Sequence, residues 1–249
     1  MLKPLHFCNL FVLFHVFPSA ALMSSVTSSG PSWEGMWARG IKPGEAFDAA
    51  KAETALLAII PGSGVSSLGS TASLDLVGKH AFVPGCGRGY SVEALSDGGC
   101  ATVVGLELAS TAVAEALSYL ESTGKPASGI TIAEGDFFAH SPAQKYDLIY
   151  DCTFLCAIPP ERRTEWALKM KELLVKGGDL VTLIFPVKDG APDPADGEIG
   201  SGPPFAMSPR LLDGLLLPLG FTKISCERVP EALVTRPFAG EYIARWYLE

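Results

Sequence analysis

The residues best suited to chemistry lie in the segment Lys79–Tyr90, which reads KHAFVPGCGRGY. A short apolar run, typical of a strand, leads into a turn with glycine at every second position from Gly85 to Gly89. A helical pattern follows at once, and about twenty residues beyond the turn a second β-type run, 102–108, carries the acid Glu107. A strand, a glycine turn, a helix and a strand that ends in an acid form half of a nucleotide-cofactor site.

The spacing of these glycines distinguishes between two kinds of cofactor. The dinucleotide motif G-x-G-x-x-G needs glycine or alanine three residues after Gly87, and this chain has Tyr90 there. The tighter spacing G-x-G-x-G resembles the first motif of methyltransferases that use S-adenosylmethionine (SAM). In that motif the loop lies near the methionine end of the cofactor, and an acid in the position of Glu107 binds the ribose hydroxyls. Glycine turns also join strands to helices without any ligand, so the acid in register is what favours a cofactor site.

Length and composition predict one large globular domain and argue against a nucleic-acid partner. The chain has 249 residues, of which 48% are hydrophobic and 18% charged, enough for a full core. Its net charge is −8, and it has no run of lysine or arginine longer than Arg162–Arg163. Because binding a polyanion normally requires a basic face, we expect a small-molecule partner rather than DNA or RNA. We also expect the chain to be a monomer.

The cysteines predict free thiols rather than a metal site. They form no C-x-x-C pair; Cys152 and Cys156 are four residues apart, and no histidine lies near them in the sequence. Such cysteines are typical of buried thiols in a reducing compartment, and a site built from ligands far apart in the sequence is the weaker alternative. The six cysteines are Cys8, Cys86, Cys100, Cys152, Cys156 and Cys226.

Residues 1–22 resemble a cleavable leader. One lysine precedes the apolar run 7–17, and the small residues of Pro18–Ala21 follow it. The run is shorter than the roughly twenty residues that a membrane-spanning helix needs, so we expect no stable span in the mature chain. A leader to a plastid or another reducing organelle agrees with the free cysteines, and a cytoplasmic protein that starts at Met23 is the alternative. The Ser/Gly-rich segment 23–32 is predicted to be flexible.

From Lys79 onward β-type and helical segments alternate, which predicts parallel strands with helices on both faces of the sheet. Two strand-like runs close the chain without a helix between them, so we expect an antiparallel hairpin at the sheet edge. These segments predict an α/β fold of the class I methyltransferase type, Rossmann-like, with a seven-stranded, mostly parallel sheet. The expected strands are 80–83, 102–107, 130–133, 146–151, 179–185, 222–228 and 241–248, and the expected helices are 47–60, 91–97, 110–122, 160–175 and 208–217.

Further candidates follow the third and fourth expected strands. Asp136 comes directly after the third strand, where methyltransferases hold the adenine amino group, although an aspartate there also caps loops. Asp151 ends the fourth strand, at the carboxyl edge where open α/β sheets bind ligands. The segment after Asp151, CTFLCAIPP, lacks the Asn/Asp-Pro-Pro-aromatic order of amino-group methyltransferases. That difference disfavours nucleobase amines and glutamine amides as acceptors.

No residue stands out as a general base. His6 and His15 lie in the leader segment, His80 opens a strand and His140 lies in a loop. Methyl transfer from a sulfonium is an in-line displacement, and an anionic nucleophile needs no proton removed. Orientation alone supplies roughly 7–11 kcal/mol in reactions of this kind. Soft nucleophiles such as thiolates and halides therefore suit the site.

Several motifs beyond the glycine turn resemble the thiopurine methyltransferase-like family, most closely its plant and algal thiol/halide methyltransferases. They are Trp33-x-x-x-Trp37, VPGCGRG, VGLE, EGDFF, YDLIYD-x-x-FLCAIPPE and SGPPF, spread from Trp33 to the C-terminus. The resemblance implies a methyltransferase domain over 33–249, SAM as methyl donor, and an N-terminal lid, 33–60, over the cofactor. It implies neither a catalytic base nor a metal.

The resemblance also implies which residues meet the cofactor and the acceptor. The residues that would bind SAM are Trp33, Trp37, Gly85, Cys86, Gly87, Gly89, Glu107, Leu108, Gly135, Asp136, Asp151 and Cys152. The residues that would line the acceptor pocket are Phe47, Phe154, Phe205 and Arg236. Two alternatives stay open: the tryptophans, four residues apart, could be packing aromatics on one helix face, and Arg236 could form a surface ion pair.

Two departures from the family bear on the acceptor. The plant enzymes continue the lid as Thr-Pro-Trp-Asp, whereas this chain has Lys42-Pro43-Gly44-Glu45 and lacks the third tryptophan. Cys152 replaces a tyrosine or arginine after the fourth strand. The sequence predicts a SAM-dependent S-methyltransferase for a small soft nucleophile: a thiol, bisulfide, thiocyanate or halide. The alternatives are a methyltransferase of another small metabolite, such as a thioether, a carboxylate or an aromatic thiol, and a SAM-fold binding protein without catalysis.

Overall fold

The computed structural model describes residues 32–65, 68, 73–124, 129–197, 200–236 and 239–249. The expected leader, 1–22, and all of the expected flexible segment except Ser32 lie outside the described residues. Within the described ranges, no helix is both long and apolar enough to cross a membrane.

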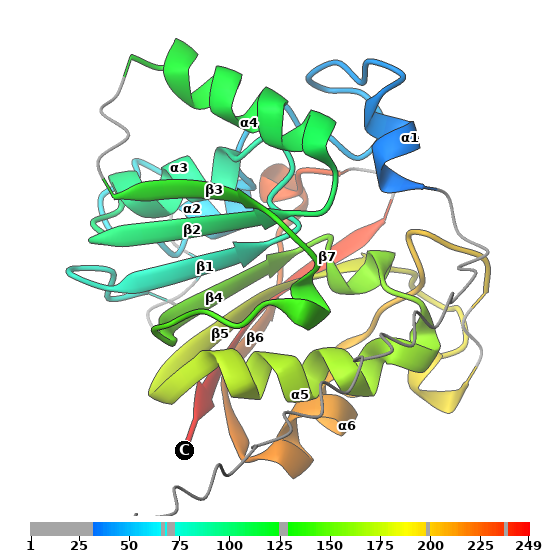
Figure 1. The fold of residues 1–249 in the computed structure, drawn as a ribbon. Helices are drawn as coiled ribbons and strands as arrows, with labels where there is room; N and C mark the ends of the chain where they lie inside the picture. Colours follow the sequence, from blue (N-terminus) through cyan, green and yellow to red (C-terminus); the bar gives the residue numbers. More distant parts are fainter. Residues whose placement is uncertain (1–31, 66–67, 69–72, 125–128, 198–199, 237–238) are drawn as a thin grey trace, which may run out of the picture. The chain divides into compact units, whose positions relative to one another are not determined.

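The described residues form one sheet of seven strands in the order β3-β2-β1-β4-β5-β7-β6 (Figure 1). Strands β1 to β5 run parallel, and β7 runs antiparallel to both of its neighbours. The predicted seven-stranded, mostly parallel sheet with an antiparallel C-terminal hairpin is confirmed. The strands are β1 His80–Pro84, β2 Thr102–Glu107, β3 Ile130–Glu134, β4 Tyr146–Cys152, β5 Leu174–Val187, β6 Phe221–Arg228 and β7 Gly240–Leu248.

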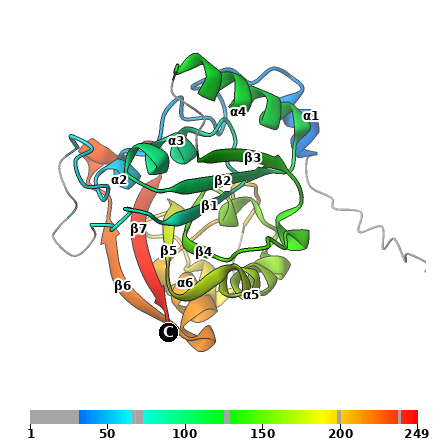
Figure 2. The ribbon, with the colours of Figure 1, turned by 60° about the vertical axis from the view of Figure 1, so that its left-hand side comes forward.

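Helices cover both faces of this sheet, as the alternating pattern predicts. Helices α2, α3 and α4 lie on one side, and α5 and α6 lie on the other (Figures 1 and 2). Side chains of β1 alternate between the two layers: Ala81 and Val83 pack with residues of α2 and α3, whereas Phe82 packs with residues of α5 and α6. The helices are α1 Trp33–Trp37, α2 Thr54–Leu57, α3 Tyr90–Asp97, α4 Ser110–Ser122, α5 Arg163–Leu173 and α6 Pro209–Leu216.

The prediction of a helix over 47–60 is wrong, because only α2 is helical in that stretch. The Asp48 carboxylate accepts hydrogen bonds from the amides of Ala50 at 2.7 Å and Gly44 at 3.4 Å. Such side-chain bonds offer the backbone an alternative to helix. Ala50 takes a left-handed conformation, with φ of 58°, so the chain enters α2 from a turn. A second boundary also moved: β5 begins at Leu174 and takes the last residues of the helix expected over 160–175.

The glycine turn follows β1 at the carboxyl edge of the sheet. Gly85, Gly87 and Gly89 have φ of 58°, 52° and 86°, a left-handed conformation that glycine adopts at no steric cost. Gly89 is the N-cap of α3. The predicted order of strand, glycine turn and helix is therefore confirmed.

This turn lies close to β2 because Gly105 has no side chain. An ideal Cβ at Gly105 would lie 2.8 Å from the Sγ of Cys86 and 2.9 Å from Cδ1 of Ile132. The Cys86 amide donates to the carbonyl oxygen of Leu106 at 3.1 Å, so the turn is also bonded to β2. The Cys86 thiol faces β2, and its burial raises its pKa far above the ordinary value. Gly105 thus sets the distance between the turn and the second strand.

Replacing Gly105 with alanine should destabilise the protein by overpacking this contact. Forcing an extra carbon into a packed interior costs typically about 1–3 kcal/mol of unfolding free energy, which urea titration would measure. Gly214→Ala is the matched control: Gly214 lies inside α6 with nothing within 4 Å of an ideal Cβ, so the change should stabilise by roughly 0.4–1 kcal/mol. A Gly105→Ala protein as stable as the wild type would contradict the role of this close approach.

Candidate cofactor-binding site

The parallel strands end at one edge of the sheet, and several predicted site residues meet there. Glu107, the last residue of β2, is 8% exposed. Its Oε2 accepts a hydrogen bond from the Gly87 amide at 2.9 Å, and its Oε1 accepts from Leu108 at 2.8 Å and from Ala109 at 3.3 Å. Burial raises the pKa of Glu107, and these three amides offset part of that rise. The carboxylate therefore lies against the glycine turn.

The segment after β3 lies beside Glu107. The Gly135 amide donates to the carbonyl oxygen of Glu107 at 2.9 Å. Asp136 is exposed, and its Oδ1 accepts from the Phe138 amide at 2.9 Å. It thereby caps the 3-10 turn Phe137–Ala139, which is the alternative that the sequence left open. One carboxylate oxygen of Asp136 is thus engaged locally, and its contact with the cofactor stays a prediction.

Three aromatic side chains of the lid form one cluster. The Phe47 ring lies edge-on to both tryptophans, with centroids 5.7 Å from Trp33 and 5.4 Å from Trp37. Trp37 is 3% exposed and packs on the start of α4. An ideal Cβ at Gly87 would lie 3.6 Å from the Trp37 ring, so this ring covers the glycine turn. Phe47 is thus the third aromatic of the lid cluster, and its predicted place in the acceptor pocket stays a prediction.

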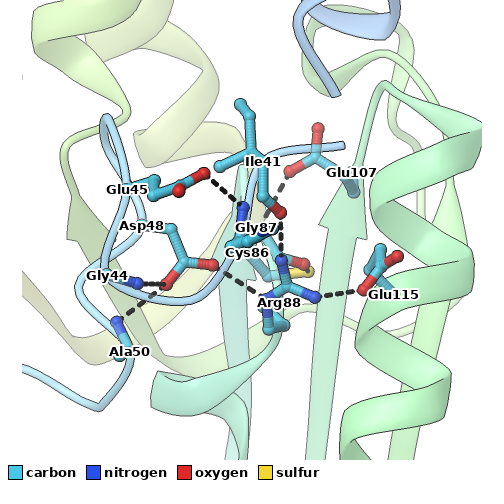
Figure 3. A network of polar contacts seen from close by, with 11 residues as sticks. Ile41, Gly44, Glu45, Asp48, Ala50, Cys86, Gly87, Arg88, Glu107 and Glu115 are labelled. Atoms are coloured by element: carbon cyan, nitrogen blue, oxygen red, sulfur yellow. Dashed lines mark hydrogen bonds and ion pairs between the residues drawn. The ribbon is translucent and has the colours of Figure 1, made fainter. Parts of the chain in front are cut away.

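A buried arginine that the sequence analysis did not select links the lid to the glycine turn (Figure 3). Arg88 is 7% exposed. Its Nε donates to Oδ2 of Asp48 at 2.8 Å, and its NH2 donates to the carbonyl oxygen of Ile41 at 2.8 Å. Its NH1 pairs with Glu115 of α4. The only signal in the sequence was an arginine inside the glycine motif, since its partners lie far away along the chain.

Asp151, near the end of β4, faces the α5 layer. It is 2% exposed, and its carboxylate accepts from Nε1 of Trp166 at 2.9 Å and from the Leu155 amide at 3.2 Å. Burial raises its pKa to about 6 in spite of these hydrogen bonds. The Asp151 side chain therefore holds the segment that follows β4, residues 153–160. The predicted contact of Asp151 with the cofactor stays a prediction.

A cluster of polar side chains lies on the other side of β4. The Glu53 carboxylate accepts from Oγ of Ser91 at 2.9 Å and from the Tyr150 hydroxyl at 3.3 Å, and it pairs with NH2 of Arg236 at 3.2 Å. Burial, reinforced by the Glu53 charge, raises the pKa of the Cys152 thiol well above its ordinary value. Arg236 is 8% exposed, so the surface ion pair considered from the sequence is wrong.

Two buried arginines keep nitrogen atoms without a hydrogen-bond acceptor among the described residues. NH1 of Arg236 lies 3.9 Å from Oε1 of Glu241 and makes no hydrogen bond there. Arg163, at the start of α5, is 4% exposed; its NH2 donates to the carbonyl oxygen of Ala206 at 3.2 Å, and its Nε has no acceptor. Both guanidinium charges act on the Cys156 thiol, whose pKa burial and Asp151 nevertheless raise to about 12. Both positive groups are thus close enough to Cys156, in the segment that follows β4, to lower the pKa of its thiol in part.

Two further phenylalanines meet this segment. The Phe154 ring lies on the glycine turn, since an ideal Cβ at Gly85 would lie 2.5 Å from it, and it is edge-on to Phe137 at 5.0 Å. Phe205 is half-buried, and its amide donates to the carbonyl oxygen of Cys156 at 2.7 Å. The five cysteines of the described residues, including Cys152 and Cys156, are free thiols.

Comparisons with known proteins agree with this geometry. The family model of thiopurine S-methyltransferase matches residues 32–236. The chain belongs to this family. Two Arabidopsis thaliana relatives are a probable thiol methyltransferase 2, 37% identical with 94% of this chain and 89% of the relative covered, and thiocyanate methyltransferase 1, 34% identical with 86% and 83% covered.

Solved structures show the fold of this thiopurine S-methyltransferase family member. A structure from work on the conversion of a disulfide bond into a thioacetal group during echinomycin biosynthesis matches with a TM-score of 0.62 at 17% identity, covering 87% of this chain and 91% of that one. Magnesium protoporphyrin IX methyltransferase from Synechocystis PCC 6803, solved with bound SAM, matches with a TM-score of 0.55 at 18% identity, covering 70% and 72%. The predicted class I methyltransferase fold is confirmed.

Membership in the family identifies the protein as a SAM-dependent methyltransferase, and the residues present fit that cofactor. Leu108 is 56% exposed, so an apolar surface suited to a flat ring lies beside the Glu107 carboxylate. A carboxylate accepts hydrogen bonds from a vicinal diol such as that of ribose. The glycine turn brings backbone close to the same edge, under the Trp37 ring. Together these protein groups suit a ligand that combines a nucleoside with an amino-acid end, as SAM does.

Asp151→Asn should gain stability relative to the wild type as the pH rises from roughly 4 to 7. The pKa of Asp151 rises from an ordinary 3.8 to about 6 in the folded protein. Between these two pH values the folded state therefore binds more protons than the unfolded state does. Stability from protonated Asp151 is present at low pH and is lost as the pH rises through about 6, whereas asparagine stays neutral. Urea midpoints of both proteins across this range would measure the difference. A difference that does not change with pH would contradict the raised pKa, and an unchanged SAM affinity would remove Asp151 from the predicted ligands.

Proposed function

We propose that this methyltransferase moves the methyl group of SAM to a small soft nucleophile: a thiol, bisulfide, thiocyanate or halide. The observation that carries the proposal is the pair of buried guanidinium groups, Arg236 and Arg163, beside the segment that follows β4. Each keeps a nitrogen without an acceptor among the described residues. Buried donors that lack partners are costly, and an anionic acceptor would satisfy them. The thiol and thiocyanate methyltransferases among the relatives agree with such an acceptor.

Arg236 acts in this proposal as a directional donor rather than as a bulk attractor of anions. Its charge is already balanced in part by Glu53 at 3.2 Å and by Glu241 at 3.9 Å. Burial raises the pKa of Glu241, opposed by its backbone hydrogen bonds and by the Arg236 charge. Weakly hydrated anions such as thiolates, thiocyanate and iodide lose less hydration on entering such a site than small hard anions do. That difference favours soft acceptors.

No histidine in the part of the chain that the structure describes is placed to remove a proton from the acceptor. Among the described histidines, His80 opens β1 at the end opposite the glycine turn, and the His140 ring stacks on Phe82 and bonds to Tyr146. The pKa of the Cys152 thiol is raised by burial, so this side chain stays neutral. A nucleophile that arrives as an anion needs no base, and orientation and exclusion of water then supply the rate.

On the cofactor side, we propose that Glu107 accepts hydrogen bonds from the ribose hydroxyls and that Leu108 and the Gly135–Asp136 segment meet the adenine. The glycine turn, with Gly85, Gly87 and Gly89, would receive the methionine end, and the lid tryptophans would exclude water above it. SAM supplies the electrophilic methyl group on its sulfonium. The side chains named here bind it, orient it and keep water away.

An aromatic thiol is the second candidate acceptor. The Phe154 ring lies on the glycine turn and against Phe137, a surface on which a ring can pack. An aromatic thiol needs the same buried donors for its sulfur. It therefore differs from the small soft nucleophiles in size, and methyl transfer from SAM to it follows the same chemistry.

Glu107→Gln should weaken SAM binding at least tenfold, as isothermal calorimetry would measure. Glutamine keeps the shape and removes the charge, and a hydrogen bond to a charged acceptor is worth about 1.5–3 kcal/mol, where 1.4 kcal/mol is tenfold in affinity. Glu172→Gln is the control, because Glu172 is an exposed residue of α5 paired with Lys169, and it should bind SAM as the wild type does. An unchanged affinity in Glu107→Gln would refute the ribose contact.

The full-length protein should form S-adenosylhomocysteine from SAM with at least one of bisulfide, thiocyanate, iodide or thiophenol, together with the methylated product. Chromatography of both products would measure this. Arg236→Lys keeps the charge but loses the forked donor geometry, so it should raise the KM of thiocyanate about tenfold and leave the SAM affinity unchanged. Turnover with a thioether or carboxylate alone would move the activity to the alternative class. No turnover with any sulfur or halide acceptor would refute the proposal.

A further inference from the structure

The side chain of Arg88 connects parts of the molecule that the mechanism so far treats separately. Its backbone belongs to the glycine turn, between Gly87, which bonds to Glu107, and Gly89, which caps α3. Its guanidinium leaves the turn and contacts the lid and α4 (Figure 3). Each of its three nitrogens donates to an acceptor, so the group is not free to bind a substrate. The role of Arg88 therefore follows from the segments that its side chain connects.

On the lid side, Arg88 fastens the stretch between α1 and α2. Nε donates to Asp48 and NH2 donates to the Ile41 carbonyl, both at 2.8 Å. The other oxygen of Asp48 accepts from the amides of Ala50 and Gly44, so one carboxylate both shapes this lid turn and binds the arginine. The guanidinium also lies 5.6 Å from the centre of the Trp37 ring, within range of a cation–π contact.

Arg88 stays charged, since burial lowers its pKa but hydrogen bonds and charge from Asp48 and Glu115 raise that pKa overall. A charge that is buried and paired by hydrogen bonds has one low-energy geometry, and breaking it leaves the partner charge buried. The contact therefore fixes where the lid stands relative to the turn, with little freedom.

Other contacts also hold the lid, and the two charged side chains among them do not reach the glycine turn. Glu34 bonds to Ser110 and Thr111 at the start of α4, and Glu53 bonds to Ser91, Tyr150 and Arg236. Among these anchors, as far as the structure describes them, Arg88 alone lies in the loop that the methionine end of the cofactor approaches. Displacing Arg88 would move the Trp37 ring and the Gly87 amide together.

We infer that Arg88 is a positioning residue for SAM: it holds the lid cluster of Trp37 and Phe47 over the glycine turn, so that binding the cofactor and enclosing it are one event. The inference rests on the cofactor alone and not on the identity of the acceptor. It predicts that losing the link weakens the binding of SAM and of its product without abolishing the fold.

Calorimetry with S-adenosylhomocysteine on the full-length protein tests this without any acceptor. Arg88→Gln and Asp48→Asn should each weaken binding about tenfold. Arg88→Gln leaves the buried Asp48 carboxylate without its cation, and Asp48→Asn leaves Nε of Arg88 without a charged acceptor on the lid. Arg88→Lys should recover part of the loss, because lysine still reaches one carboxylate but not three acceptors. The double variant should bind no more weakly than the worse single variant, as expected for residues that act through one contact.

The control is Arg245→Gln. Arg245 makes a bidentate pair with Asp179 at 2.9 and 3.0 Å, at the end of β5 away from the glycine turn. Its loss should lower the melting temperature and leave the affinity unchanged. Limited proteolysis gives a second readout: S-adenosylhomocysteine should protect cleavage sites in 38–53 of the wild type and of Arg245→Gln, and protect them far less in Asp48→Asn.

Wild-type affinity in both Arg88→Gln and Asp48→Asn would overturn the inference. So would an equal loss of affinity in Arg245→Gln, because the effect would then follow general stability. Should Arg88→Gln fail to fold, Asp48→Asn and Arg88→Lys decide the question by the same measurements. Asp48→Asn keeps the size of the side chain, and Arg88→Lys keeps its charge.

Discussion

The hydrogen bond from the Gly87 amide to the Glu107 carboxylate is the contact on which the site depends. It joins the turn after β1 to the end of β2, two segments that leave the sheet side by side because the parallel register pairs Pro84 with Leu106. The bond can form only because Gly105 lets the turn approach β2. The Gly135 amide on the Glu107 carbonyl adds the end of β3 to the same assembly. Three separate loops thus meet at one residue, Glu107, at the carboxyl edge where open parallel sheets bind their ligands.

The lid depends on this assembly for its own structure. Helices α1 and α2 have five and four residues, far below the length at which a helix is stable by itself in water. Their position is set by charged side chains: Glu34 bonds to the start of α4 at the surface, and Asp48 and Glu53 are buried. Burying ions is costly, and a pair adds little net stability over an apolar contact. The ion pair does, however, favour one geometry. For the proposed lid, a defined position over the glycine turn matters more than added stability.

Elements with local causes could be predicted from the sequence, and contacts between distant segments could not. All seven strands were predicted within a few residues, apart from the early start of β5, because hydrophobic runs and glycine turns mark them. The pairing of Glu107 with the glycine turn followed from the motif. The helix over 47–60 failed because the apolar spacing there hid the turn that Asp48 makes with its own backbone.

The partners of the buried charges were missed for a related reason, although Arg236 itself was named as a pocket residue. Arg88 lies 40 residues from Asp48 and 27 from Glu115, and Arg236 lies 183 from Glu53. No periodicity links residues so far apart. The contact of Phe47 with Trp33 and Trp37 could not be read from the sequence either. Phe47 comes three residues after Gly44, which stands in the position of the missing tryptophan, and is followed by Asp48.

The protonation of the site limits which nucleophiles it can serve. Burial keeps Cys152, Cys156 and Tyr150 in their neutral forms, and the carboxylates on this side of β4 are already engaged by arginine or by hydroxyl groups. The proposed acceptor would therefore lose its proton in water, before it enters. A thiol with a pKa near or below neutral, or an anion that carries no proton at all, arrives ready to react. An aliphatic thiol, with a pKa near 8.5, enters as the thiolate only in the small fraction that is ionised, and this fraction multiplies its rate. In the proposed function, the arrangement around Arg236 and Arg163 would thus select acceptors by their acidity as much as by their shape.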